Sequence, residues 1–109
     1  MPGGLTYSAK VGKVFVTELV SANTWYQVLT KANAHNIRGF KIKSRYTSGQ
    51  PPNDFDYAFN STPSAGADTD GNGFYSMTGS GAGDTAAVSN GLWARSNEAN
   101  TFIEVMTYE

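Results

Sequence analysis

The stretch Ile37-Arg-Gly-Phe-Lys-Ile-Lys-Ser-Arg-Tyr46 alternates mainly apolar with basic side chains from Phe40 onward. The two faces would carry Phe40, Ile42, Ser44 and Tyr46 on one side and Lys41, Lys43 and Arg45 on the other. A period of two belongs to a β-strand with one buried face and one face in solvent. We therefore expect a strand that supplies part of the core and a dense stripe of positive charge.

A second alternating stretch, Asp54-Phe-Asp-Tyr-Ala-Phe-Asn60, follows after a loop that contains two adjacent prolines. Proline cannot donate to a strand ladder, so this loop ends the first strand. If the two stretches form a hairpin, their aromatic faces coincide, and Asp54 and Asp56 lie on the basic side. Lys43 and Arg45 are the bases that they would meet. We therefore predict an ion-matched hairpin, and for its basic stripe an architectural role rather than nucleic-acid binding.

The composition favours an all-β protein. Of 109 residues only 16% are charged, and twelve glycines and four prolines separate short runs rich in β-branched and aromatic residues. Further runs typical of strands cover residues 14–20, 25–30, 74–78, 92–96 and 101–108. We expect one antiparallel β-sandwich domain of jelly-roll type over residues 13–109, with about 7–8 short strands. A flexible arm or an edge strand is expected over residues 1–12.

The aromatic residues are expected to fill the core, because the chain has only four leucines. The expected core aromatics are Phe40, Phe55, Tyr57, Phe59 and Phe102. Residues 14–20 are apolar on both faces, so we expect them to be buried on both sides, with Glu18 near an edge. Residues 31–36 and 79–91, which are polar or rich in glycine, are expected to form turns and loops.

Charge and residue usage narrow the function. A net charge of −1 gives no general attraction to nucleic acid or to an anionic membrane. The chain has no cysteine, one histidine (His35) and no nucleophile-elbow pattern, which leaves little for catalysis or a zinc site. No apolar run approaches the ~20 residues that span a bilayer. We expect a protein that is not an enzyme, needs no cofactor, and binds neither nucleic acid nor membrane.

One motif could hold a metal ion. Asp68-Thr-Asp-Gly-Asn-Gly73 places oxygen-bearing side chains at alternate positions, and Asp68, Asp70 and Asn72 could converge on calcium. The motif matches the start of an EF-hand loop, but the twelfth position is Gly79 where that loop needs glutamate. An EF-hand is therefore excluded. A partial calcium loop and a plain Asp/Asn/Gly turn both stay open.

The two tryptophans are candidates for partner contact. Trp25 and Trp93, if exposed at the rim of a sandwich, could stack on sugar rings or anchor a protein interface. The alternative is that they pack in the core of a small domain. Their position in the fold decides between these hypotheses.

The order of these motifs resembles small accessory virion proteins of tailed bacteriophages. The resemblance rests on Tyr26-Gln-Val-Leu, Arg38-Gly-Phe-Lys-Ile-Lys-Ser-Arg, Asp56-Tyr-Ala-Phe, Gly91-Leu-Trp-Ala-Arg-Ser96 and Phe102-Ile-Glu-Val-Met, within residues 14–108. It implies a β-sandwich or jelly-roll module used as a capsid decoration (cement) protein or in a head or tail fibre. It supplies no catalytic residue.

The resemblance also implies a mechanical function on the outside of the capsid. Copies would bind the major capsid protein and one another, as homotrimers at threefold positions, and reinforce the assembled shell. Contacts are expected through residues 1–12 and the loops at 61–73 and 79–91. The alternative is a carbohydrate-binding module or fibre domain that uses Trp25 or Trp93 together with the Asp68 loop.

Overall fold

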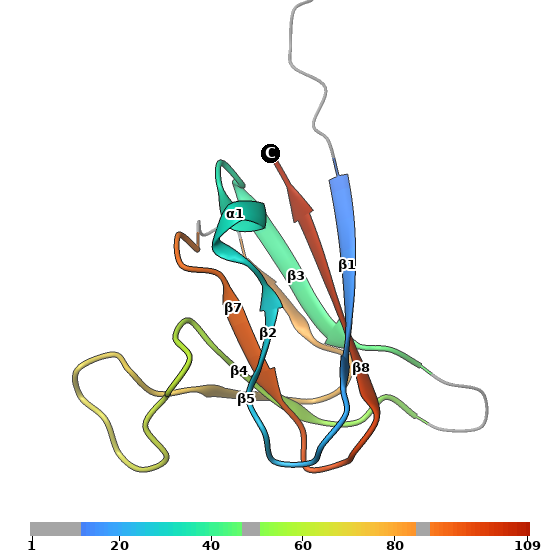
Figure 1. Ribbon diagram of the computed structural model, residues 1–109, viewed down its shortest axis with the longest axis vertical. Coiled ribbons are helices and arrows are strands. Elements are labelled where there is room, and N and C mark those ends of the chain that lie inside the picture. The colour runs from blue at the N-terminus through green and yellow to red at the C-terminus, as the bar shows by residue number, and fades with distance from the viewer. Residues whose placement is uncertain (1–11, 47–50, 85–87) are drawn as a thin grey trace, which may run out of the picture.

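The computed structural model describes residues 12–46, 51–84 and 88–109, which form two antiparallel sheets (Figure 1). Sheet A has the strand order β1-β8-β3-β6, and sheet B has the order β2-β7-β4-β5. The strands are β1 (Gly12–Leu19), β2 (Tyr26–Leu29), β3 (Gly39–Ser44), β4 (Phe55–Ala58), β5 (Tyr75–Met77), β6 (Ala82–Asp84), β7 (Leu92–Arg95) and β8 (Thr101–Tyr108). A short helix, α1 (Lys31–Ala34), follows β2.

The strand pairing defines a jelly roll. β1 pairs with β8, β2 with β7, β3 with β6, and β4 with β5. These are the pairs of one long antiparallel hairpin, and successive pairs alternate between sheet A and sheet B. Rolling the hairpin up adds the pairings of β3 with β8 and of β4 with β7, which complete each sheet. The expected antiparallel β-sandwich is confirmed.

The core lies between the sheets and follows the predicted alternation. β8 alternates buried and half-buried residues along its whole length, and Ile103 and Val105 are fully buried. Ile42 of β3 lies opposite Val105, and Leu92 and Phe55 cover this layer from sheet B. Burying each such side chain stabilises the fold by ~1.5–3 kcal/mol relative to leaving it in water.

The predicted hairpin between the first two stretches is wrong. β3 and β4 belong to different sheets, so no ladder joins them. Lys43 and Arg45 instead form ion pairs with Glu104 of β8, and Asp56 pairs with Arg95 of β7. Alternation fixes which face a side chain occupies, but it does not fix the neighbouring strand.

The expected burial of residues 14–20 on both sides is also wrong. β1 lies at one edge of sheet A, where Phe15 packs against the core while Val14 and Val16 point outward. Val14 is 62% exposed and Val16 is 43% exposed. Glu18 is exposed on this edge strand, as expected. The apolar pattern of β1 therefore belongs to an outer face that is exposed among the described residues.

Two of the expected core aromatics lie outside the core. Phe59 follows β4 and is 51% exposed. Phe102 is half-buried and alternates with the core residues of β8, so it lies on the outer face of sheet A. Phe40 and Phe55 are buried, and Tyr57 is partly buried against the core, as expected.

Two expected loops contain regular structure. Residues 31–34 form α1, because the Thr30 hydroxyl accepts a hydrogen bond from the backbone N–H of Asn33 at 3.2 Å and caps the first turn. Strand β6 lies within the expected loop at 79–91.

Of the expected arm over residues 1–12, only Gly12 lies within the described residues, and it begins β1. No helix in the described ranges is long and apolar enough to cross a membrane.

Candidate functional site

The outer face of sheet A carries an apolar strip along β1 and β8. We define this apolar strip as Val14, Val16, Phe102 and Met106. Val14 lies directly opposite Met106 in the ladder, and Val16 lies two positions from Val14 on the same face. Side chains in adjacent strands approach closely enough for these three residues to form one apolar surface. Phe102 is separated from them, because Glu104 lies opposite Val16 between Phe102 and Met106, and Glu18 lies opposite Phe102.

Charged residues lie within the apolar strip, at Glu104 of β8, and beside it on β3. Arg45 Nε donates to Glu104 Oε2 at 2.6 Å, and Lys43 Nζ lies 3.5 Å from Glu104 Oε1. The hydrogen bond from Arg45, aided by the positive charge of Lys43, holds the pKa of Glu104 below its ordinary value although partial burial opposes this shift. The basic stripe is thus partly neutralised by β8, and not by the predicted Asp54 and Asp56.

The free edge of β1 adjoins the apolar strip. Its ladder with β8 runs without interruption from Gly12 to Leu19, and β1 forms no other ladder within the described ranges. Natural proteins usually protect such edges with proline, a bulge, charged side chains or a covering segment, because unpaired backbone groups invite another strand. β1 contains no proline and its register has no bulge, but it carries the exposed charges of Lys13 and Glu18. The edge can therefore accept a strand from a partner chain.

The predicted calcium residues lie in the β4–β5 connection, which projects beyond the sandwich (Figure 1). Asp68 Oδ1 accepts hydrogen bonds from the backbone N–H groups of Asp70 at 2.8 Å and Asn72 at 3.1 Å. Its Oδ2 accepts the Ser64 hydroxyl at 2.6 Å, which, with the backbone bonds, lowers the pKa of Asp68. Asp68 thus closes the loop upon itself, whereas the side chains of Asp70 and Asn72 are exposed.

The two tryptophans lie on or beside the outer face of sheet B, and both are half-buried. Trp93 of β7 is in register with Gln27 and Ala58. Trp25, just before β2, lies 5.5 Å from the ring of Phe74, measured between centroids. Neither tryptophan belongs to the buried core cluster, so the core alternative for them is not met.

Arg95 links this aromatic pair to the sheet, and the sequence reasoning missed it. Its guanidinium carbon lies 4.8 Å from the Trp25 ring centre and 4.6 Å from that of Phe74. The same group donates to Asp56 Oδ2 from Nε at 3.2 Å and from Nη2 at 2.8 Å. The alternation of residues 92–95 could have indicated it, because Trp93 and Arg95 lie on the same face of that strand.

The described part of the chain contains no cluster of side chains suited to hold a metal ion. No group of three or more His, Cys, Asp or Glu side chains there could hold a metal ion. Comparison with protein-family models, with curated proteins and with solved structures finds no match to this chain.

Proposed function

We propose that this chain is a structural virion protein, a decoration protein that attaches to the outside of an assembled phage capsid. The apolar strip and the free edge of β1 form its attachment surface. The observation that carries the proposal is the exposure of Val14 and Val16, at 62% and 43%, beside a regular strand edge that forms no ladder with any other described segment. Its partners are the major capsid protein and further copies of this chain.

Exposed apolar surface is costly unless a partner covers it. Contiguous apolar patches on soluble proteins commonly mark interaction sites, because water leaves them favourably on binding. A strand edge adds backbone hydrogen bonds to that contact. Both features lie on sheet A, so one face of the sandwich can dock as a unit.

A repeating shell suits a weak attachment surface of this kind. Many modest contacts, repeated over a lattice and within an oligomer, give strong overall attachment without any site chemistry. The jelly-roll fold is used in viral capsid proteins, although it also occurs in lectins and enzymes. The proposed assembly is a homotrimer, as the sequence resemblance implies.

The test uses purified protein and phage heads assembled without it. The protein is mixed with the heads, the heads are sedimented, and the bound protein is quantified. We expect saturable binding at a fixed number of copies per head, and light scattering should report a trimer in solution. Protein that stays in the supernatant at every concentration would contradict the proposal.

A further inference from the structure

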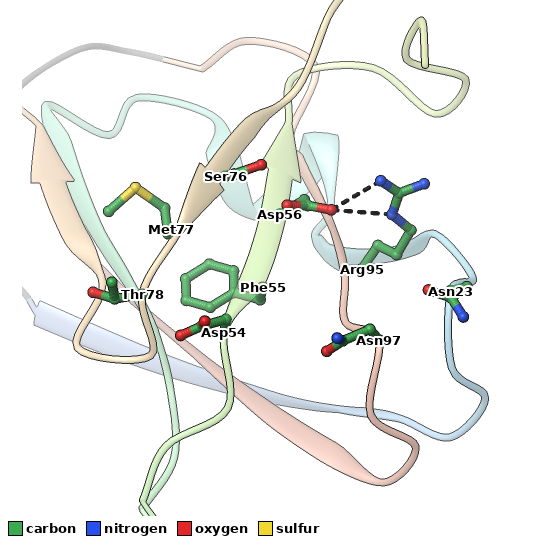
Figure 2. A pocket seen from close by; sticks show the side chains of 9 residues that line it. All are labelled: Asn23, Asp54, Phe55, Asp56, Ser76, Met77, Thr78, Arg95 and Asn97. Atoms are coloured by element: carbon green, nitrogen blue, oxygen red, sulfur yellow. Dashed lines mark hydrogen bonds and ion pairs between the residues drawn. The ribbon is translucent and has the colours of Figure 1, made fainter. Parts of the chain in front are cut away.

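The outer face of sheet B carries two rows of polar side chains at one end of the sheet. In the first row Asp56 lies in register with Ser76 of β5 and Arg95 of β7. The second row consists of Asp54, Thr78 and Asn97, each two positions from a residue of the first row and just beyond the end of its strand. All six line one hollow of about 400 Å³, together with Asn23, Phe55 and Met77 (Figure 2).

Part of this lining is already engaged in the fold. Arg95 is held by Asp56 on one side and by the Trp25 and Phe74 rings on the other. Asp54 Oδ1 accepts a bond from the backbone N–H of Gly79 at 3.3 Å. These contacts hold the side chains of Arg95, Asp56 and Asp54 in one orientation. A ligand therefore loses less entropy on binding, because these side chains need not be ordered first.

The rest of the lining has free hydrogen-bonding capacity. The side chains of Asn23, Ser76 and Asn97 form no hydrogen bond with any other residue of the described ranges. Each amide offers two donors and an acceptor, and a hydroxyl offers one donor and acceptor lone pairs. A ligand that both donates and accepts at closely spaced positions would match this set.

The charge of the hollow selects the class of ligand. Its lining contains two carboxylates and one guanidinium, so its formal charge is negative and does not favour an anion. A divalent cation is a poor match, because one of the two carboxylates is already paired with Arg95. Neutral hydroxyl groups can use carboxylate, amide and hydroxyl partners alike. Half-buried Met77 adds apolar surface for the C–H groups of a sugar ring, whereas Phe55 is almost fully buried in the core.

We infer that this hollow binds a neutral oligosaccharide. Its volume lies within the roughly 300–1,000 Å³ usual for ligand sites, and its polar lining suits a sugar better than an apolar compound. The lining contains none of Trp25, Trp93 and Asp68, the residues of the carbohydrate site suggested by the sequence, and Trp25 lies next to the hollow only through its contact with Arg95. It lies on the opposite sheet from the apolar strip, so the inference does not depend on capsid attachment.

The two surfaces are compatible on one particle. A chain docked through the outer face of sheet A would leave the outer face of sheet B directed away from the shell. Individual protein–sugar contacts can then be weak, because an array of copies multiplies them. The partner class is a surface rich in neutral glycans.

The test is a glycan array of neutral and acidic oligosaccharides probed with the full chain, followed by titration of the best glycan monitored by amide NMR shifts. We expect neutral glycans to bind, with shifts centred on residues 54–56, 76–78 and 95–97. Asn97→Ala should weaken binding on the order of fivefold to tenfold, because it removes hydrogen bonds to the ligand. Ser76→Trp should abolish binding by filling the hollow.

Asn33→Ala is the matched control, since Asn33 is equally an exposed asparagine but lies on α1. It should bind like the parent chain, and all three variants should keep the parent circular dichroism spectrum. The inference is overturned if no neutral glycan binds at millimolar concentration, if acidic glycans bind in preference, or if Ser76→Trp binds as tightly as the parent. Attachment to phage heads is measured separately, so failure here leaves that proposal standing.

Discussion

Phe40 of β3 and Tyr57 of β4 meet edge to face across the core, with ring centroids 6.3 Å apart and planes inclined at 76°. They belong to opposite sheets, so their contact ties sheet A to sheet B. Tyr57 in turn contacts Phe59 at 6.0 Å and Tyr75 at 5.8 Å. Tyr57 therefore joins the two layers through Phe40 and also pairs with Tyr75 within sheet B.

Phe40 and Phe59 offer a direct comparison of buried and exposed aromatic residues. Phe40 is 1% exposed, so Phe40→Ala should lower the free energy of unfolding by about 3–5 kcal/mol through lost burial and a residual cavity. Phe59→Ala removes the same side chain from a site that is 51% exposed, and it should cost less than about 1 kcal/mol. Urea denaturation measures both values. Equal losses would contradict the assigned core.

Acid should weaken the ion pairs around Glu104. Its pKa is lower in the folded chain than its ordinary value of 4.5, so the pairs stabilise the fold above that pH. This stabilisation is lost as the pH falls through the lower, folded-state pKa. Because Lys43 and Arg45 are 53% and 44% exposed, solvent screening limits the effect to about 0–1 kcal/mol.

Urea denaturation at about pH 6 and about pH 3 isolates this contribution. Other carboxylates also titrate between these pH values, so the parent chain is compared with Glu104→Gln. The free energy of unfolding of Glu104→Gln should fall less on acidification than that of the parent chain. Glu98→Gln is the control, because Glu98 is exposed and forms no ion pair within the described ranges. Equal acid sensitivity of Glu104→Gln and the parent chain would refute the assigned pairs.

The Asp68 loop predicts the outcome of a calcium titration. Both carboxylate oxygens of Asp68 already accept hydrogen bonds that close the loop, so calcium would have to compete for them. We expect millimolar calcium to leave the melting temperature unchanged. Asp68→Ala should speed hydrogen exchange of residues 64–72 without unfolding the sandwich, whereas Asp70→Ala should not. A calcium-dependent rise in melting temperature that Asp68→Ala removes would instead identify a partial calcium loop.

The sequence predicted which side chains are buried better than it predicted which strands pair with each other. Phe40 and Ile42 are buried and Lys43 is exposed, as the period of two requires. The partner of Arg45 lies 59 positions away, however, and nothing local distinguishes Glu104 from the nearby Asp54 and Asp56. Several strands of this chain share the same alternation, so sequence proximity favoured a hairpin that the rolled topology does not contain.

The candidate surfaces could not be predicted from the sequence, because they depend on the order of the strands in each sheet. An apolar pattern on both faces fits a central strand as well as an edge strand with an uncovered face, and only the position of β1 in sheet A distinguishes them. Glu18 was the one local sign of an edge. The polar hollow draws residues from both sides of β4, and its existence depends on the register of three strands.

Binding of two matched variants to phage heads assembled without this protein tests the central claim most directly. Val14 in the apolar strip is 62% exposed, and Tyr75 on the edge of sheet B is 63% exposed, so lysine at either site should leave the fold intact. We predict that Val14→Lys reduces co-sedimentation with heads by on the order of tenfold or more, whereas Tyr75→Lys binds like the parent chain. Parent-like binding of a folded Val14→Lys variant would contradict the assignment of this surface.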